Sequence, residues 1–539
     1  MKPRTVLIGL DGATFAVLNP LMQDGTMPFL QKFVASGTHA LLRSTIPALT
    51  PPAWTSMMTG RSPGYHGIFN FFGKEAANSA HIRLLTSNDV GAETIWSYAN
   101  RHDLRATVLN FPLTFPAPHI DGQVVAGGWM PWRQLRLGCY PPELYDRIKT
   151  LPGFNPREIA MDMAHEEKAL EGVQQEEYEG WIELHTRRER HWFNVLRFLV
   201  ENDPTDLITV LFDGVDKLQH LCWRFLDPVY APTLTEAWEF RVRQQCVNYF
   251  AQLDGLIASI VELAGPDATI VMTSDHGFGP QVRTFFVNTW LQQHGYLAWA
   301  DGEGPRPSET SVLGMKQVAR HTYQLDWTRT QAYASMPGGN GIQIVRADAD
   351  HPYGIPDTEY DELCAKLVAE LQQIKDPETG EAVIAAAWRR EEVFVGPYHD
   401  MAPDITLELQ DGGLFSILAS ETIVSPRRPP TGTHAPDGIF IAGGPDIRRG
   451  VELPELSILD IAPLLLYSLD LPIPTDLEGQ VPSEAIEPSR LIRQPVHKVT
   501  AEPKAAVVAP EVGFEDESGL DEEDEAELMR RLQALGYVE

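Results

Sequence analysis

Short apolar runs rich in β-branched residues recur along the chain. They cover residues 6–10, 106–110, 207–212 and 269–274, and a similar run covers residues 438–444. A continuous apolar run of this length is typical of a strand buried on both faces, as in a parallel sheet, because a half-exposed strand would alternate. We therefore predict that these segments are buried strands of one core.

Stretches with helical periodicity lie between the predicted strands. Residues 20–36, 53–59, 234–263 and 452–470 are expected to be helical. Residues 155–201 are charged, poor in Gly and Pro, and carry apolar side chains at helical spacing, which predicts a long amphipathic helix packed on the sheet. Alternating strands and helices predict an α/β fold with a mostly parallel sheet flanked by helices.

The regular alternation breaks in the second half of the chain, which suggests an insertion. We predict that residues 1–295 form the first part of an α/β core and that residues 429–486 return to it. Residues 296–428 would be an inserted subdomain or cap, in which residues 404–409 alternate like an edge strand. Residues 487–539 are rich in Pro, Ala, Val and charge, and are predicted to be a flexible linker followed by an acidic helix.

The charge of the chain narrows the classes of partner. The 539 residues carry a net charge of −31, of which −9 lies in residues 511–539. Such a charge repels the phosphate backbone of duplex nucleic acid, so we expect no duplex binding. The acidic tail could bind a partner or dock on its own chain. No apolar run is long enough for a membrane span.

The pattern of the four cysteines indicates the cellular compartment of the protein. Cys139, Cys222, Cys246 and Cys364 are scattered, without the close pairing of a thiolate metal site. We expect free, buried thiols in a reducing compartment, and therefore a cytoplasmic protein.

Aspartates and histidines follow the predicted strands. Asp11 comes after the first, Asp216 and His220 come shortly after the run at 207–212, and Asp275 and His276 come after the run at 269–274. The carboxyl ends of parallel strands meet at one edge of a sheet. Asp216 and His220 are four residues apart and share a face if helical.

Two further residues complete the pattern. His434 precedes the run at 438–444, and Thr50 opens the predicted helix at 53–59. Singly, each residue could be a turn or capping residue, and we assign Asp213 such a structural role. Together, mixed carboxylate and imidazole ligands predict a site for two divalent cations, Zn²⁺ or Mn²⁺. Thr50 would be the hydroxyl that these cations activate.

The chain resembles the alkaline phosphatase superfamily, and most closely its type I phosphodiesterase/nucleotide pyrophosphatase branch. The resemblance rests on short motifs that occur in the family's order: Gly-Leu-Asp-Gly at 9–12, the Thr50 loop with Thr-Gly-Arg-Ser-Pro-Gly-Tyr-His-Gly-Ile at 59–68, the Asp216 and His220 pair, Ser-Asp-His-Gly at 274–277, and Gly-Thr-His at 432–434.

The resemblance implies a ligand set and a mechanism. One metal would be held by Asp11, Thr50, Asp275 and His276, and the other by Asp216, His220 and His434. Thr50 would be the nucleophile, and a phosphothreonine intermediate would form and then be hydrolysed by water.

Several departures from the patterns of related families limit the assignment. Pro-Pro-Ala follows Thr50 where nucleotide pyrophosphatases often have Phe-Pro-Asn, and Asn70 lies close to a second family asparagine but one residue early. The loop lacks the Cys/Ser-x-Pro-x-Arg signature of sulfatases, and no serine stands at the nucleophile position. Ser44, Thr45 and Thr55 are rival hydroxyls.

The sequence therefore predicts a metal-dependent hydrolase of phosphate esters, with a phosphodiester or nucleotide pyrophosphate as its small-molecule substrate. One alternative is a phosphomonoesterase or phosphotransferase on the same scaffold. Another is a non-catalytic metal-binding scaffold that acts through its acidic tail.

Overall fold

The computed structural model divides the chain into two compact units. Among the residues that the structure describes, the first comprises those within 1–62, 86–278 and 434–501, and the second comprises those within 63–85 and 279–433. The structure describes residues 3–74, 82–127, 130–160, 175–300, 324–336, 338–349, 351–410 and 412–501. The predicted acidic C-terminal helix lies outside the described residues, so the partner expected for it stays a prediction.

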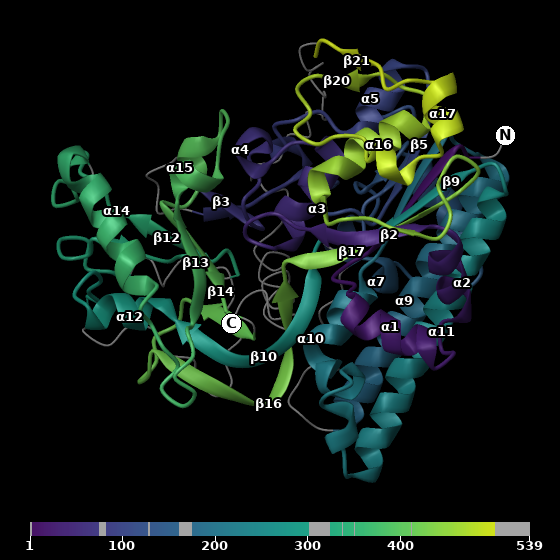
Figure 1. The fold of residues 1–539 in the computed structure, drawn as a ribbon. Helices are drawn as coiled ribbons and strands as arrows, with labels where there is room; N and C mark the ends of the chain where they lie inside the picture. The colour runs from purple at the N-terminus through teal and green to yellow at the C-terminus, as the bar shows by residue number, and fades with distance from the viewer. Residues whose placement is uncertain are drawn as a thin grey trace. The chain divides into compact units, whose positions relative to one another are not determined.

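A ten-stranded sheet forms the centre of the first unit (Figure 1). β1 pairs in parallel with β8 and β9, and β5 pairs in parallel with β6 and β8, whereas β17 is antiparallel to both neighbours and β7 is antiparallel to β6. The sheet is therefore mostly parallel, as predicted. Its strands, in spatial order, are β18 (Val451–Glu452), β2 (Thr38–Arg43), β17 (Asp437–Gly443), β9 (Thr269–Thr273), β1 (Thr5–Leu10), β8 (Leu207–Phe212), β5 (Ala106–Leu109), β6 (Gly122–Val125) and β7 (Cys139–Tyr140), and β19 (Leu456–Ser457) also pairs with β2.

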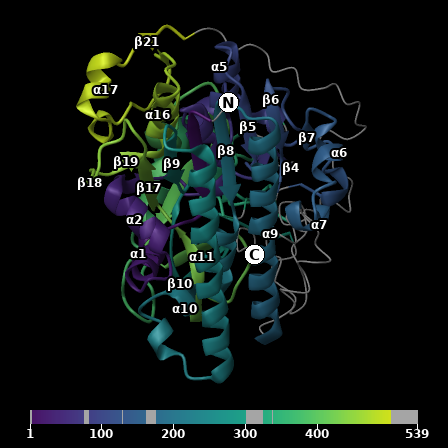
Figure 2. The same ribbon diagram turned by 90° about the vertical axis from the view of Figure 1, so that its right-hand side faces the viewer.

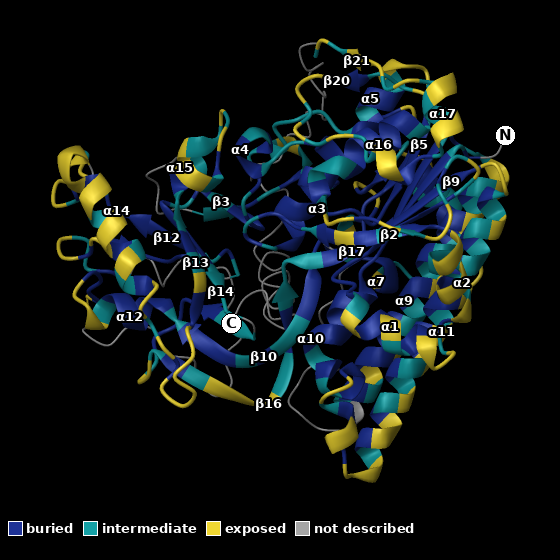
Figure 3. Ribbon diagram, viewed as in Figure 1, coloured by how far each residue is buried: buried dark blue, intermediate teal, exposed yellow. Residues whose placement is uncertain are grey.

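Both faces of this sheet are covered, which explains the continuous apolar runs. In β1, Val6 and Ile8 belong to one hydrophobic cluster and Leu7 to another, because successive side chains of a strand point to opposite faces. All three are fully buried. Figure 3 shows the strands buried and the outer faces of the helices exposed.

Helices of the first unit supply the two clusters. Residues of α1 (Phe15–Gln23), α2 (Pro28–Ser36), α9 (Gln175–Asn202), α10 (Gly214–Leu226) and α11 (Ala237–Ala264) join the first cluster. Residues of α3 (Thr50–Thr59), α5 (Ile95–Arg101) and α16 (Ile461–Ser468) join the second. Figure 2 shows α9 and α11 packed side by side along the sheet. The short helices α6 (Leu144–Ile148), α7 (Pro156–Ile159) and α17 (Pro488–Arg493) and the strands β20 (Ile473–Pro474) and β21 (Lys498–Val499) complete the unit.

The predicted helix at 20–36 is wrong in one respect: it is two helices. α1 ends at Gln23, and the chain turns before α2 begins at Pro28. Gly25 adopts a φ of +84°, a left-handed conformation that ends a helix, and the Asp24 side chain accepts a hydrogen bond from the N–H of Thr26. The turn chemistry therefore overrides the apolar periodicity.

Two other segments differ from the sequence expectation. The segment predicted as one helix at 452–470 begins with β19 and a short 3₁₀ turn, and only α16 is α-helical. Residues 487–501, assigned to the flexible linker, are folded as α17 and β21. Arg490 forms ion pairs with Asp446 and Asp470, which anchor α17. The long helix predicted over 155–201 is represented by α7 and α9, and the segment 161–174 between them is not among the described residues.

The second unit contains smaller sheets. One has the strand order β11 (Ala332–Tyr333), β12 (Gly341–Ile344), β14 (Ile405–Leu409) and β13 (Ile384–Arg389). β14 lies between two neighbours, so the prediction that 404–409 is an edge strand is wrong. Burial does not follow the alternation either, because Ile405, Thr406 and Leu407 are all buried. Its other helices and strands are β3 (Phe72–Lys74), β4 (Ile82–Leu84), β15 (Gly413–Ser416), α4 (Pro63–His66), α12 (Val287–Gln293), α14 (Asp357–Leu371) and α15 (Arg390–Val393). β10 (Gly277–Phe286) and β16 (Val424–Ala435) lie mostly in this unit, but residues 277–278 and 434–435 belong to the first unit.

Two sequence-wide expectations can be compared with the described residues. All four cysteines are free and buried, as predicted. Among the described residues, no helix combines the length and the apolar character that crossing a bilayer requires. The predicted boundaries at 295, 428 and 486, and the substrate-cap role of the insertion, stay predictions.

Candidate metal centre

Strand register brings the predicted aspartates together. Leu10 of β1 pairs with Phe212 of β8, and Gly9 pairs with Thr273 of β9. Asp11 directly follows Leu10, and Asp275 lies two residues after Thr273. Both aspartates therefore leave the sheet at the same edge. α10 then begins at Gly214, directly after β8, and carries the next ligands. The architecture thus follows the rule that ligand sites lie at the carboxyl ends of parallel strands.

The first group consists of Asp11, Asp275 and His276, all fully buried. His276 Nε2 lies 3.2 Å from Asp275 Oδ2 and 3.8 Å from Asp11 Oδ1. One ligand atom from each residue lies within 4.8 Å of the others, a spacing that suits a single metal ion. Thr50 joins this group, because its Oγ1 lies 3.3 Å from His276 Nε2.

The second group consists of Asp216 and His220 of α10 and His434 of β16. His434 Nε2 lies 3.3 Å from Asp216 Oδ1 and 3.1 Å from His220 Nε2, and His220 Nε2 lies 3.5 Å from the same aspartate oxygen. The His434 ring stacks on the His276 ring with 3.7 Å between their centroids. Donor atoms of Asp216, His276 and His434 also lie within 4.8 Å of one another. The two groups are therefore contiguous, with His276 between them.

Hydrogen bonds from outside the site orient the ligands. His276 Nδ1 lies 3.0 Å from the carbonyl of Gly277, and His434 Nδ1 lies 3.1 Å from the carbonyl of Ala48. A carbonyl can only accept, so Nδ1 carries the proton and Nε2 presents a lone pair to the site. Gly12, with a φ of +64°, donates its N–H to Asp275 Oδ1 at 3.1 Å.

The protonation preferences fit cation binding. Burial, reinforced by the neighbouring charge of Asp275, raises the pKa of Asp11 well above its usual value, and burial raises the pKa of Asp275. Burial lowers the pKa of His276 to about 4 and also lowers the pKa of His434, so both rings are neutral near pH 7. Burial opposes ionisation of Asp216, but the adjacent histidines hold its pKa well below the usual range.

Two buried carboxylate oxygens without hydrogen-bond partners indicate whether metal ions fit the site. Within the described part of the chain, Asp11 Oδ1 and Asp275 Oδ2 are buried and accept no hydrogen bond. A buried carboxylate oxygen without a partner costs about 1–3 kcal/mol or more. A bound cation would satisfy both atoms and offset the mutual repulsion of the carboxylates. The donor set therefore fits divalent metals.

Thr50 is positioned by the start of α3. The helix begins at Thr50, and Pro51 and Pro52 occupy its first turn, where a missing N–H is tolerated. Thr50 is fully buried, and its hydroxyl faces His276. The rival hydroxyl of Thr45 instead donates to the carbonyl of Pro47 at 2.8 Å.

Comparison with known proteins places this geometry in a family. The family model of type I phosphodiesterase/nucleotide pyrophosphatase matches residues 5–437, which include every predicted site residue. The chain belongs to this family. The membership confirms the predicted resemblance and the prediction that the chain is a phosphoester hydrolase. A comparison with curated proteins finds no match.

Solved structures of low sequence identity share the fold of this family member. A crystal structure of phosphonoacetate hydrolase from Sinorhizobium meliloti 1021 in complex with phosphonoacetate is 17% identical, with a TM-score of 0.50, over 87% of this chain and 95% of that chain. Human ectonucleotide pyrophosphatase/phosphodiesterase 5 is 13% identical, with a TM-score of 0.50, over 90% of this chain and 100% of that chain. The predicted α/β fold is thus confirmed.

Asn70, the displaced family asparagine, lies in the second unit and is 2% exposed. Its Oδ1 accepts a hydrogen bond from the N–H of Phe71 at 2.6 Å, and its Nδ2 lies against Gly339. A Cβ at Gly339 would approach that nitrogen to 2.6 Å. The amide is therefore held inside its own unit, and its predicted role as a donor to phosphoryl oxygen stays open.

Sequence analysis missed a buried charge cluster behind α10. Glu189 of α9 accepts hydrogen bonds from the N–H of Gly214 and the hydroxyl of Tyr249, both at 2.9 Å. Lys217 Nζ lies 2.5 Å from Asp213 Oδ2, which agrees with the structural role predicted for Asp213. The cluster holds the first turn of the helix that carries the second ligand group. Its sequence signal is a glutamate within the apolar stripe of a long helix.

The Glu189 carboxyl predicts a pH dependence of stability. Burial and the nearby charge of Asp213 raise its pKa to about 8, whereas an unfolded glutamate titrates near about 4.3. Between these values the folded state binds more protons, so the free energy of unfolding falls as the pH rises toward about 8. Glu189→Gln stays neutral, and its unfolding free energy should fall less between about pH 6 and about pH 8, by on the order of 2 kcal/mol.

Urea unfolding of wild type and Glu189→Gln at several pH values measures this difference. Glu183→Gln on the same helix is the matched control, because the Glu183 side chain is 72% exposed. It should parallel the wild-type profile. Parallel profiles for Glu189→Gln and wild type would show that Glu189 is ionised in the folded state at neutral pH.

Proposed function

We propose that the protein hydrolyses phosphate diesters or nucleotide pyrophosphates at a two-metal site, through a phosphothreonine intermediate on Thr50. The observation that carries the proposal is the position of the Thr50 hydroxyl. It lies 3.3 Å from His276 Nε2, where the two carboxylate–histidine groups meet. A hydroxyl beside two cation sites matches the requirement for an activated oxygen nucleophile.

We propose that Asp11, Thr50, Asp275 and His276 hold one metal and that Asp216, His220 and His434 hold the other. Mixed nitrogen and oxygen donors suit Zn²⁺, with Mn²⁺ as the alternative. Bound cations would stabilise the Thr50 alkoxide and offset the negative charge of the phosphoryl oxygens in the transition state. The two orphaned aspartate oxygens described above support this assignment.

In the proposed reaction, Thr50 Oγ1 forms a bond to phosphorus opposite the leaving oxygen, and the phosphorus–oxygen bond of the ester breaks. Water then hydrolyses the threonine ester and restores the hydroxyl. Pro51 and Pro52 have no N–H, and the N–H of Ala53 already donates to the carbonyl of Leu49 at 3.0 Å. Residues 51–53 of α3 therefore offer no free N–H group to phosphoryl oxygens. We propose that the positive charge of bound cations attracts these oxygens instead.

The two structural neighbours differ in the chemistry that their names describe. One acts on phosphonoacetate, a small phosphonate, and the other is a nucleotide pyrophosphatase/phosphodiesterase. Both names are consistent with a small phosphoryl compound as the substrate of this chain. We favour a diester or pyrophosphate over a monoester because the matching family carries that description.

Metal content and paired chromogenic substrates test the proposal together. We expect near two equivalents of metal per chain, and a higher kcat/KM for bis(p-nitrophenyl) phosphate than for p-nitrophenyl phosphate. The reverse preference would establish the monoesterase alternative. Bound metal without activity on either ester would favour the scaffold alternative. A chain free of metal after preparation in metal-replete buffer would contradict the proposed site.

A further inference from the structure

Trp54 contacts the first ligand group through its indole ring. The residue lies on α3, four positions after Thr50, and is 1% exposed. Its Nε1–H donates a hydrogen bond to Asp11 Oδ2 at 3.4 Å. The other oxygen of this carboxyl group, Oδ1, lies 3.8 Å from His276 Nε2. The two oxygens of Asp11 therefore have different surroundings: the indole holds one, and the other faces the proposed metal ligands.

Packing fixes the direction of this N–H group. A Cβ at Gly9 on β1 would lie only 2.6 Å from Cη2 of Trp54, so the ring lies directly against the backbone of the strand. The Phe111 ring packs edge-on against the indole, with 5.3 Å between the ring centroids. Gly9 lies two residues before Asp11. The strand that leads to the ligand thus also forms the surface that positions the hydrogen-bond donor.

A neutral donor suits this position. Indole only donates and carries no charge, so it restricts the rotation of the Asp11 carboxylate without neutralising it. Carboxylates that bind metals are commonly hydrogen-bonded to residues outside the site, and these partners raise metal affinity. Because a ligand oriented in advance loses less conformational freedom on binding, the contact between Trp54 and Asp11 should strengthen metal binding.

The same helix carries the proposed nucleophile. Thr50 and Trp54 are four residues apart, so both side chains project from one face of α3. Thr50 Oγ1 lies 3.3 Å from His276 Nε2. Since a helix is a rigid element, α3 holds the hydroxyl and the donor to Asp11 at a fixed spacing.

We propose that Trp54 is a positioning residue of the first metal site. Its indole N–H holds Asp11 with Oδ1 toward the other ligands, and its place on α3 keeps Thr50 beside them. The inference deepens the proposed function and rests on the assignment of Asp11 as a metal ligand. It predicts an effect on metal affinity that is separate from the effect of the ring's volume on stability.

Two substitutions of Trp54 separate the hydrogen-bond donor from the ring volume. Trp54→Phe keeps a larger apolar ring and removes the N–H. Trp54→His loses more apolar volume and keeps a donor, because Nε2 of imidazole is about as far from Cβ as Nε1 of indole. Metal affinity should be higher in Trp54→His than in Trp54→Phe, whereas the free energy of unfolding should be lower. A role in packing alone would place Trp54→His below Trp54→Phe in both measurements.

Metal affinity is measured by titrating the metal-free, full-length protein with Zn²⁺ against a competing chelator, at about pH 8, where imidazole is neutral. The titration uses no substrate and is therefore independent of hydrolysis. We expect two dissociation constants for wild type. In Trp54→Phe, one should rise by about tenfold or more, and the other should stay within a few fold. Trp54→His should recover most of the lost affinity.

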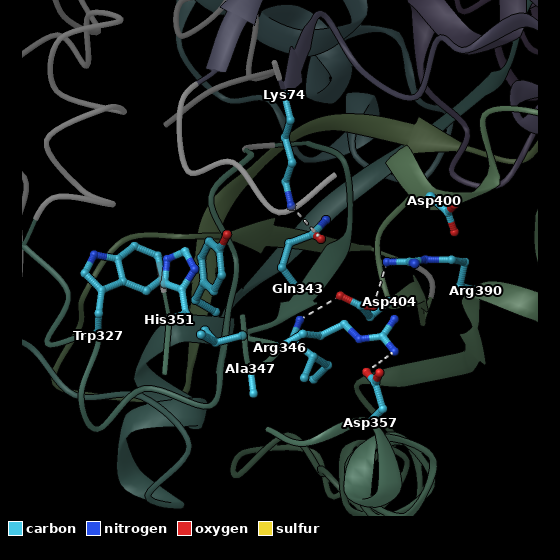
Figure 4. A pocket seen from close by; sticks show the side chains of 13 residues that line it. Lys74, Trp327, Gln343, Arg346, Ala347, His351, Asp357, Arg390, Asp400 and Asp404 are labelled. Atoms are coloured by element: carbon cyan, nitrogen blue, oxygen red, sulfur yellow. Dashed lines mark hydrogen bonds and ion pairs between the residues drawn. The ribbon is translucent and has the colours of Figure 1, made fainter. Parts of the chain in front are cut away.

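Two other tryptophans provide matched controls for the same change. Trp96 of α5 belongs to the same hydrophobic cluster, is 4% exposed, and lies 6.3 Å from the same Phe111 ring. Trp327 lies in the second unit, where it lines a cavity of about 370 Å³ (Figure 4). Trp96→Phe should lower the free energy of unfolding without changing either dissociation constant. Trp327→Phe should also leave both constants unchanged.

An isosteric replacement removes the donor without changing the shape of the side chain. Benzothienylalanine, introduced at position 54 by codon suppression, has sulfur in place of the indole N–H. It should raise the same dissociation constant as Trp54→Phe does, while the free energy of unfolding stays near that of wild type. This measurement remains decisive if either conventional substitution prevents folding, which circular dichroism detects.

Two results would overturn the inference. Wild-type affinities in both Trp54→Phe and the isosteric replacement would show that the contact with Asp11 does not orient a metal ligand. Lower affinity in Trp54→His than in Trp54→Phe, with the isosteric replacement equal to wild type, would show that only ring volume matters. A wild type that binds no metal would overturn the metal centre and this inference together, whereas bound metal without ester hydrolysis would overturn the proposed function alone.

Discussion

Replacing Thr50 with alanine is expected to abolish phosphate-ester hydrolysis while most of the bound metal remains. The substitution removes the hydroxyl and one methyl group, and the carboxylate and imidazole side chains stay in place. Removal of a nucleophile commonly lowers kcat by about three orders of magnitude or more. The measurement is kcat and KM for bis(p-nitrophenyl) phosphate, with metal content determined on the same preparation.

Two neighbouring substitutions make this result specific. Thr50→Ser keeps a hydroxyl at the start of α3 and should retain measurable activity. Thr45→Ala removes a hydroxyl that donates to the carbonyl of Pro47, and it should leave kcat within a few fold of wild type. Activity in Thr50→Ala close to that of wild type, combined with loss in Thr45→Ala, would move the nucleophile assignment to the preceding loop.

Acid quenching during turnover adds a direct observation. A phosphothreonine is stable enough in acid to be found by peptide mass spectrometry. Wild type should carry the modified mass on the peptide that contains Thr50, and Thr50→Ala should not. Loss of activity in the alanine variant without any modified peptide in wild type would point to direct attack by water, with Thr50 serving only as a ligand.

The grouping of the candidate metal ligands could be anticipated from the sequence because several of these residues follow strand ends. Apolar runs identify buried strands, parallel strands place their carboxyl ends at one edge, and the register of β1 with β8 and β9 then brings Asp11 and Asp275 together. His434 is different. It enters the site from the end of a long strand far along the chain, and its local signal is only that it precedes the apolar run at 438–444.

The second unit shows what local sequence pattern cannot provide. The alternation at 404–409 was read as an edge strand, but β14 has a partner on each side. Whether a strand has one neighbour or two depends on segments distant in the chain, and periodicity does not report them.

The buried cluster around Glu189 illustrates a third limit. A glutamate on a charged amphipathic helix normally faces water, and the place of Glu189 within the apolar stripe is a weak local sign that it does not. Its environment is set by α11 and by the start of α10, which contribute Tyr249 and Gly214. Burial of a single polar residue is a tertiary property, so sequence periodicity finds the helix but not the function of each polar position.

Replacing His434 with alanine is expected to remove one of the two metals. His434 contacts both other members of its group, at 3.3 Å from Asp216 Oδ1 and 3.1 Å from His220 Nε2. Without it, Asp216 and His220 would offer too few ligands for tight binding of Zn²⁺, which commonly has four. We expect the metal content to fall from near two equivalents to near one, and kcat to fall by about 100-fold or more.

The matched control is His294→Ala, since His294 caps the end of α12 in the second unit, where its Nδ1 contacts the carbonyl of Trp290 and its ring stacks on the Trp290 ring. It should keep both metals and the wild-type rate. Partial rescue of His434→Ala by excess Zn²⁺ or Mn²⁺ would confirm that the loss lies in affinity, because the remaining ligands are still oriented by their own hydrogen bonds. Retention of two tightly bound metals with unchanged activity would remove His434 from the ligand set and leave its stacking on His276 as a purely structural contact.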